Sequence, residues 1–209
     1  MSGNDEAKSV QAHQARQKVD RRVLRTRDRL GDALVALMQE KPFDDITVQE
    51  VLDRAGVSRS TFYVHYRDKD DLFLSDVDEF LELMANGLSR RGEKSERVAP
   101  VREFFAHVAE GQRLYAALVE AGRIPDFMEL AEEHFARGIE RRLTEIPRAQ
   151  DVAAASRALL AHALAGAMLS MMQWWLARGM PTSPEQMDTI FHQMVWSGVG
   201  NEAAGTKKN

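Results

Sequence analysis

Apolar residues recur at intervals of three and four positions along most of this sequence. The first such stripe consists of Leu30, Ala33, Leu34, Leu37 and Met38, which is the spacing of one buried face of a helix. No segment shows sustained alternation of apolar and polar residues between turn signals, which is the pattern of a half-buried strand. The sequence therefore predicts an all-α fold with about nine helices.

The composition is that of a globular protein and excludes several kinds of site. A chain of 209 residues, 44% of them hydrophobic, can bury one large core or two small ones. It contains no cysteine, which excludes disulfides, thiolate metal sites and cysteine nucleophiles. The histidines, among them His107, His134 and His162, show no zinc-binding spacing, so we expect no metal and no cofactor.

The two ends of the sequence are expected to lie outside the folded part. Residues 1–19 are polar and charged and lack the apolar segment of a secretory signal, so we expect a disordered tail there. Residues 201–209 are expected to form a flexible tail. Between the tails we expect one domain over residues 20–68 and a second over residues 69–200.

An uncharged segment over residues 158–177 is long enough to cross a lipid bilayer. His162, Ser170 and Gln173 interrupt it, and alanine and methionine dominate it in place of leucine, isoleucine and phenylalanine. We therefore favour a buried helix of a cytoplasmic protein that has no membrane partner.

Basic residues are concentrated near the N-terminus, although the whole chain has a net charge of −4. Residues 1–69 hold 13 basic and 11 acidic residues, so this part carries +2 and residues 70–209 carry −6. Residues 16–29 alone hold seven basic residues and two acidic ones. Such asymmetry is typical of a chain that meets a polyanion with one of its parts, although a solvated basic helix end gives the same local charge.

A helix-turn-helix pattern follows the first apolar stripe. Thr47-Val48-Gln49-Glu50 has the residues of a capping box, which begins a helix, and Gly56 supplies a turn residue that takes positive φ easily. Ser58 is expected to cap a short helix from Arg59 to about Val64. In such a motif the second helix can enter the major groove of DNA with its N-terminal residues at base edges.

Several short motifs in this region resemble the N-terminal domain of TetR-type transcriptional regulators. They are Thr26-Arg27 with the run to Ala33, Ile46-Thr47-Val48, Ala55-Gly56-Val57-Ser58, Thr61-Phe62-Tyr63-x-His65-Tyr66 and Lys69-x-x-Leu72. Gly31 and the pair Pro42-Phe43 depart from the family pattern. The resemblance implies a three-helix DNA-binding domain followed by a helical domain for effector binding and dimerisation.

Candidate DNA-contacting residues fall into two groups. Base contacts are expected from Arg59, whose guanidinium can pair bidentately with guanine, from Ser60 and Thr61 and, by the resemblance, from Gln49. Contacts to the DNA backbone are expected from the basic run, from a helix N-terminus and from positions that resemble the family's phosphate contacts. These residues are Arg21, Arg22, Arg25, Thr47, Tyr63, His65 and Lys69.

Some of these aromatic and basic positions also have structural interpretations. We favour packing against the first helix for Tyr66, whereas His65 fits packing and DNA contact equally well. Lys69 fits a DNA contact and also fits a solvated position among the acidic residues around it. The sequence alone leaves the roles of His65 and Lys69 open.

The remaining sequence predicts six more helices. The first is long, starts after Lys69 and ends near Gly92, and the others begin near Pro100, Leu114, Pro125, Asp151 and Pro184. Aromatic and methionine residues in these helices are candidates for an effector cavity, although a stripe of this kind is more often core. The candidates are Phe80, Leu83, Met84, Phe104, Phe105, His107, Tyr115, Phe127, Met128, Phe135 and Met168.

The helix expected over about residues 151–178 is apolar on more than one side, so more than one side must be covered. Because the chain is short, a second copy of it is the natural cover, and small residues permit close approach. The expected interface residues are Ala163, Gly166, Ser170 and Trp174, with Ile190 and Met194 of the last helix.

Together these features predict a homodimeric regulator, usually a repressor. It would bind a pseudo-palindromic double-stranded DNA operator and be released by a small apolar or amphipathic effector. One alternative is a helical-bundle enzyme or small-molecule binding protein with an incidental basic N-terminus, but no catalytic motif supports an enzyme. The other alternative is a TetR-type regulator without an effector, including an activator.

Overall fold

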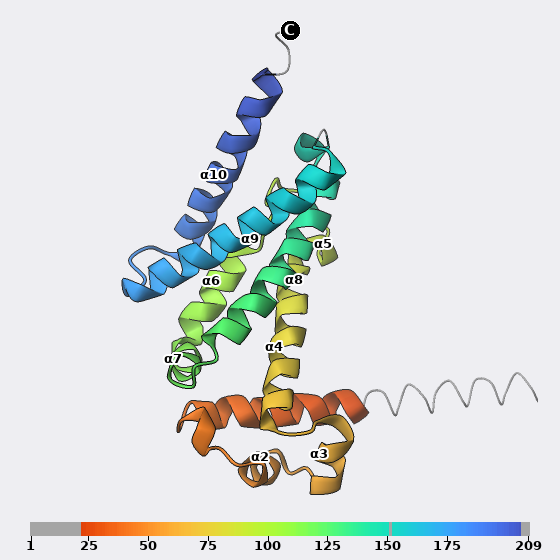
Figure 1. Ribbon diagram of the computed structural model, residues 1–209, viewed down its shortest axis with the longest axis vertical. Coiled ribbons are helices and arrows are strands. Elements are labelled where there is room, and N and C mark those ends of the chain that lie inside the picture. The colour runs from red at the N-terminus through yellow and green to blue at the C-terminus, as the bar shows by residue number, and fades with distance from the viewer. Residues whose placement is uncertain (1–21, 151, 206–209) are drawn as a thin grey trace, which may run out of the picture. The chain divides into compact units, whose positions relative to one another are not determined.

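The computed structural model describes residues 22–150 and 152–205. Within these ranges the protein contains ten α-helices, two short 3₁₀ helices and no strand (Figure 1). The all-α prediction is therefore confirmed. The described chain divides into two compact units between Asp76 and Val77, inside a helix and later than the predicted boundary after residue 68.

The first unit consists of four helical elements and the start of a fifth. They are a helix over residues 22–38, η1 (Phe43–Asp45), α2 (Val48–Ala55), α3 (Arg59–His65) and the first turns of α4 (Lys69–Ala85). The stripe predicted for the first helix is buried throughout, and Phe43, Ile46 and Phe62 complete a closed core.

The prediction of one long helix from Lys69 to near Gly92 is wrong in its C-terminal part. α4 ends at Ala85, and a separate short helix, α5 (Gly87–Arg90), follows, which gives one helix more than expected. At this point α8 (Ile124–Glu145) passes so close that a Cβ atom on Gly138 would lie 2.5 Å from the Ala85 carbonyl oxygen. The Asn86 side chain is buried here and accepts a hydrogen bond from Arg141 of α8 (2.5 Å). These contacts stabilise the break between α4 and α5.

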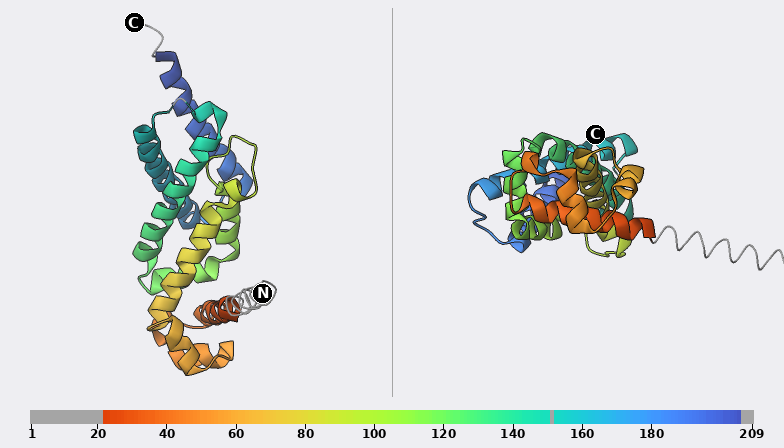
Figure 2. Two further views of the ribbon diagram at one scale, coloured as in Figure 1. Left: turned by 90° about the vertical axis from the view of Figure 1, so that its right-hand side faces the viewer. Right: turned by 90° about the horizontal axis from the view of Figure 1, so that it is seen from below.

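The rest of the second unit consists of α6 (Val101–Glu110), α7 (Gln112–Glu120), α8, η2 (Pro147–Ala149), α9 (Ala154–Ala177) and α10 (Pro184–Gly205). Three of these helices begin at or next to the prolines that were predicted to mark their N-termini. Pro100 precedes α6, Pro125 lies in the first turn of α8, and Pro184 is the first residue of α10. α9 lies along α8, and α10 lies against α6 (Figure 1 and Figure 2).

Aromatic contacts join these helices in the core of the second unit. The ring centroids of Phe104 and Phe135 are 4.8 Å apart, and those of Phe105 and Trp175 are 5.1 Å apart. All four side chains are almost completely buried, and the Trp175 indole donates a hydrogen bond to the Thr182 carbonyl (2.8 Å). Trp175 therefore fixes both α9 and the connection to α10.

Within the described ranges, α9 is the one helix long and apolar enough to cross a membrane. Seven of its residues are buried inside the protein, including Ala161, Met168 and Trp175, and the helix packs along α8. Such a composition is also typical of the core helix of a globular protein, which is the interpretation that this packing favours.

Candidate nucleic-acid interface

α2 begins with the predicted capping box. The Thr47 hydroxyl accepts a hydrogen bond from the Glu50 amide (3.3 Å), and the Glu50 carboxylate accepts one from the Thr47 amide (2.9 Å). Lys41 donates to the same carboxylate (2.7 Å), and these donors together lower the pKa of Glu50 to about 2. The Thr47 hydroxyl also donates to Glu50 (2.8 Å), so the candidate phosphate contact is engaged within its own helix cap.

The turn between α2 and α3 depends on a contact between Gly56 and the first helix. Gly56 has φ = 60°, which a side chain would disfavour. The Arg29 guanidinium donates to the carbonyl oxygens of Ala55 and Gly56, where it compensates the negative end of α2. A Cβ atom at position 56 would lie 2.8 Å from this guanidinium. Arg29, one of the basic run, therefore has a structural role that the charge count did not reveal.

α3 combines one anchored side with one exposed side. The Ser58 hydroxyl accepts from the Thr61 amide (3.2 Å) and so caps the helix, which runs to His65. Phe62 is fully buried, whereas Arg59 and Ser60 are exposed and Tyr63 is half-exposed. The N-terminal turn of α3 therefore exposes the hydroxyls of Ser58 and Ser60 and the guanidinium of Arg59 to solvent, while Phe62 anchors the helix in the core.

The side chains of this exposed surface are arranged by contacts with one another. The guanidinium carbon of Arg59 lies 5.9 Å from the centre of the Tyr63 ring, within the range of a cation–π contact. The Ser58 hydroxyl lies 3.1 Å from that of Ser60 and 2.8 Å from that of Thr61. Gln49 is exposed on α2, and its amide donates to Asp53 (2.8 Å).

Lys69 is placed differently from a phosphate contact. Its ammonium donates to the carbonyl oxygens of Phe43 (2.7 Å), Asp44 (3.1 Å) and Ile46 (2.9 Å). It also lies 4.6 Å from the centre of the Phe43 ring. An ammonium has three N–H donors, and three carbonyl oxygens, from η1 and its C-cap Ile46, lie within hydrogen-bond distance of it. The structure thus gives Lys69 a structural role, and neither the solvated interpretation nor a direct phosphate contact fits this geometry.

The two aromatic residues at the end of α3 differ in burial. Tyr66 is buried, and its hydroxyl accepts a hydrogen bond from Arg27 of the first helix (3.1 Å). Burial raises the pKa of the Tyr66 hydroxyl, although the Arg27 contact opposes this. This placement supports the packing interpretation of Tyr66. His65 is partly exposed beside it, with ring centroids 6.2 Å apart, so its role stays open.

The basic run divides into structural and exposed residues. Arg27 and Arg29 bind groups of the first unit, whereas Arg22 and Arg25 are exposed on the first helix. Arg21 lies outside the described residues. Arg22 and Arg25 are therefore the described arginines of the run that remain candidates for DNA-backbone contacts.

The structure divides the predicted effector residues between the core and separate grooves. Phe80, Leu83 and Met84 line one groove together with Gly87, Arg91 and Glu103, and Tyr115 lines another between α7 and α9. His107 stacks on Phe80, with ring centroids 4.3 Å apart. Met128 is partly exposed, and the other candidates, Phe104, Phe105, Phe127, Phe135 and Met168, are buried core residues. Arg91 and Glu103 were not predicted, because nothing near the end of α5 or in the first turn of α6 marks which charged residues turn toward α4.

The predicted interface residues lie on the solvent side of their helices. Trp174 is 49% exposed, Ile190 48% and Met194 47%, which is unusual for apolar side chains of this size. Ala163 and Ser170 are also exposed, and Gly166 is partly exposed. Residues 163, 166, 170 and 174 share one face of α9, opposite to the buried Trp175 stripe.

Among the described residues, no group of three histidine, aspartate or glutamate side chains is arranged to hold a metal ion. The buried histidine, His134, instead joins α8 to α4. Its Nε2 atom lies 2.8 Å from Asp78 and its Nδ1 atom 3.2 Å from Glu82. These side-chain contacts join α8 to α4 in the second unit and were not predicted, because His134 occupies an ordinary position of an apolar stripe.

Two family models match the chain and together cover more than half of it. The model described as bacterial regulatory proteins of the tetR family matches residues 30–75. The model described as a transcriptional regulator C-terminal region matches residues 100–196. The first match contains η1, α2 and α3, and the second begins at α6 and includes most of α10.

Individual proteins agree with these matches. The HTH-type transcriptional regulator YxbF of Bacillus subtilis is 25% identical over 186 residues, which cover 82% of this chain but only 44% of YxbF. EthR of Mycobacterium tuberculosis is 28% identical over 184 residues, which cover 78% of this chain and 82% of EthR. A crystal structure of a TetR transcriptional regulator from Streptococcus agalactiae has a TM-score of 0.57 and 25% identity, with 86% of this chain and 98% of that chain covered.

These relatives are transcriptional regulators, which removes the enzyme alternative. The first unit has a capped, exposed second helix of a helix-turn-helix within the matched segment, and the second unit is entirely helical over its described residues. The chain belongs to the TetR family of DNA-binding transcriptional regulators.

Proposed function

We propose that the protein is a homodimeric repressor that reads a pseudo-palindromic operator with α3 and is released by a small effector. The observation that carries this proposal is the anchored but exposed N-terminal turn of α3. Phe62 fixes the helix from inside, whereas Arg59 and Ser60 are exposed to solvent. A helix held in this way can be inserted into the major groove without a change in its own packing.

We assign sequence reading to Arg59, Ser60, Thr61 and Gln49. The planar guanidinium of Arg59 can pair with O6 and N7 of one guanine, and such a pair contributes about 1–3 kcal/mol of discrimination. Ser60 and Thr61 are short hydroxyl residues that suit base edges or phosphates. Gln49 would exchange its present hydrogen bond to Asp53 for a base contact.

Other residues position the first unit on the DNA backbone. Arg22 and Arg25 are exposed cations, and Tyr63 offers a half-exposed hydroxyl next to Arg59. Thr47 and His65 are further candidates, and Arg21 completes the basic set by its sequence position. Such contacts hold the domain in register but do not read bases, and their contribution to affinity falls steeply with salt.

Dimerisation supplies the second reading helix. The exposed apolar residues of α9 and α10 are expected to be covered by the same residues of a second copy, which gives a two-fold interface. A dimer of this kind presents two α3 helices, and a pseudo-palindromic operator must place its half-sites roughly 34–36 Å or a small multiple apart. Regulation then requires only that an effector favours a different separation of the two helices, and a coupling of about 1–3 kcal/mol suffices. As an operator-binding protein, it is proposed to act in the cytoplasm.

The test is selection of duplexes from a random-sequence library, followed by binding at two salt concentrations. We expect one preferred inverted-repeat sequence and a steep fall of affinity with salt. Arg59→Ala should lose preference at one base position of each half-site, whereas Arg113→Ala, an exposed arginine of α7, should bind like the unmodified protein. Uniform binding to all sequences would contradict the proposal.

A regulator without an effector is the second candidate, because TetR-type proteins with that character exist. The two are distinguished by whether any small molecule lowers operator affinity of the intact dimer. Repression and activation are distinguished by transcription from the selected operator in the presence and absence of the protein.

A further inference from the structure

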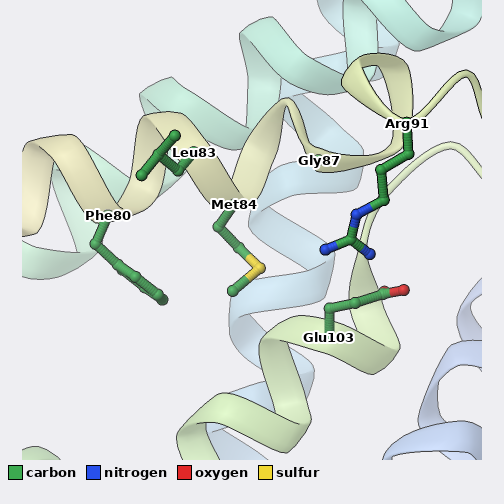
Figure 3. Close-up of a pocket in the computed structure, with 6 residues that line it drawn as sticks. All are labelled: Phe80, Leu83, Met84, Gly87, Arg91 and Glu103. Carbon is green, nitrogen blue, oxygen red and sulfur yellow. The ribbon is translucent and has the colours of Figure 1, made fainter.

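A small groove lies in the second unit where α4, α5 and α6 meet. It has a volume of about 190 Å³ and is lined by Phe80, Leu83, Met84, Gly87, Arg91 and Glu103 (Figure 3). This is less than the roughly 300–1,000 Å³ of a drug-sized ligand site, so only a small ligand fits. The groove is composed of one apolar side and one charged side.

The apolar side comes from the last turns of α4. Phe80, Leu83 and Met84 lie at positions three and four apart and therefore share a face of that helix. Leu83 is 49% exposed, although it is a large apolar residue in the second unit. The Phe80 ring is stacked on the His107 ring. His107 is partly open to solvent, but the burial of its ring lowers the pKa of the imidazole and so favours the neutral form.

The charged side has one cation without a protein partner. The Arg91 guanidinium makes no hydrogen bond or ion pair with the residues that the structure describes, and Figure 3 shows it directed into the groove. Glu103 is the carboxylate of the groove, but it is already bound by Arg97 (3.1 and 2.5 Å) and Arg102 (3.0 Å). Although burial opposes this, the Arg97 contact lowers the pKa of Glu103 to about 2.

The carboxylates next to the groove already have partners. Arg97 is shared between Glu103 (2.5 Å) and Asp188 (2.7 Å), and Arg102 also binds Glu103 (3.0 Å). The carboxylates are engaged by Arg97 and Arg102, and Arg91 is left as the group that an added anion would meet. Guanidinium groups bind carboxylates through two parallel hydrogen bonds, which suits a planar anion at this position.

We propose that this groove binds a small organic carboxylate whose apolar chain lies on Phe80, Leu83 and Met84 while its carboxylate pairs with Arg91. The inference rests on the proposed function in that it assigns the effector to this site. The first turns of α4 belong to the first unit and its last turns belong to the second. A ligand that binds one conformation of the last turns more tightly than another therefore shifts the conformational equilibrium of a helix that both units share.

The experiment measures binding of octanoate and of 1-octanol to the full chain by isothermal titration calorimetry. The two probes share an apolar chain and differ in the charged group. We expect octanoate to bind about tenfold more tightly, because a hydrogen-bonded ion pair to Arg91 is available only to the carboxylate. Arg91→Gln should remove this preference, whereas Arg90→Gln, the neighbouring exposed arginine outside the groove, should retain it.

A second variant tests the apolar side. Met84→Trp fills the groove and should abolish binding of both probes, while the melting temperature and operator binding report whether the variant is folded. Equal affinity for octanoate and 1-octanol, or an unchanged octanoate preference in Arg91→Gln, would overturn the proposal.

Operator release is measured separately and distinguishes this inference from the proposed function. Octanoate binding that depends on Arg91 but does not lower operator affinity supports the site and contradicts its role as the effector site. Operator binding without any octanoate binding leaves the regulator proposal standing and overturns the site.

Discussion

Gly31 of the first helix lies directly against the carboxylate of Asp76 in α4. A Cβ atom at position 31 would be 2.1 Å from the nearer carboxylate oxygen and 2.8 Å from the carboxyl carbon. The sequence suggests only that glycine weakens the helix here, since glycine costs about 1 kcal/mol relative to alanine in a helix interior. The structure shows instead that glycine leaves room for the Asp76 carboxylate against the first helix, within the first unit.

Gly31→Ala is therefore expected to destabilise the protein. Overpacking of a well-packed site costs about 1–3 kcal/mol, which exceeds the gain in helix propensity. The free energy of unfolding, measured with urea, should fall by roughly 1–2 kcal/mol. In the double variant Gly31→Ala with Asp76→Ala the clash is removed, so the cost of the first substitution should disappear. Additive effects of the two changes would show that Asp76 is not the cause.

Lys69→Met is expected to reduce stability and to leave the electrostatic part of DNA binding unchanged. The substitution keeps an apolar side chain near Phe43 but removes the donor to three carbonyl oxygens, at a cost of about 1–3 kcal/mol. The slope of log affinity against log salt should not change, because no phosphate contact is lost. Arg22→Met is the matched control, since this exposed residue should show the opposite pattern, with unchanged stability and a slope shallower by about 0.9.

The helices and the nature of the DNA-binding surface are predictable from the sequence because their signals are local. A capping box, a glycine in a turn and a buried phenylalanine among polar neighbours each determine structure over a few residues. The apolar residues on the solvent side of α9 are predictable for a similar reason, because their helical spacing places them on a different face from the buried stripe. A helix that is apolar on several sides is expected to be covered on each of them.

Contacts between segments far apart in the sequence are not predictable in this way. The roles of Arg29 and Lys69 depend on carbonyl groups more than 20 residues away, so neither the local charge pattern nor the family resemblance of Lys69 reveals them. The end of α4 depends on the approach of Gly138, which no pattern near residue 85 reveals. Core and cavity residues cannot be separated either, because Phe80 and Phe104 share the same periodicity.

The ion-pair cluster around Arg97 predicts how stability depends on pH. Burial opposes ionisation of Glu103 and Asp188, but hydrogen bonds from Arg97, and for Asp188 also from His192, lower both pKa values to about 2. Because these folded-state values lie below those of the unfolded chain, the carboxylates stabilise the fold above about pH 5. That contribution is lost as the pH falls toward 2.

The comparison of Glu103→Gln with the unmodified protein tests this dependence. At pH 7 the variant should be less stable by on the order of 2 kcal/mol, and the difference should shrink as the pH approaches 2. Thermal and urea unfolding across this range provide the measurement. Glu110→Gln, an exposed carboxylate of the same helix, should show little difference at any pH. A difference for Glu103→Gln that stays constant with pH would mean that its carboxylate is not the stabilising group.

The exposed apolar face of α9 and α10 predicts the oligomeric state. We expect the protein to sediment as a dimer, and Trp174→Glu to weaken dimerisation by about 30-fold or more, because a charge would replace a large apolar side chain at the interface. Val119→Glu is the matched control: Val119 is an apolar residue with similar exposure, but it lies on α7, so the dimer should persist. Sedimentation equilibrium gives both dissociation constants. If Trp174→Glu and Val119→Glu dimerise equally well, the two copies associate through another surface, and the spacing of the two α3 helices must be set by that surface.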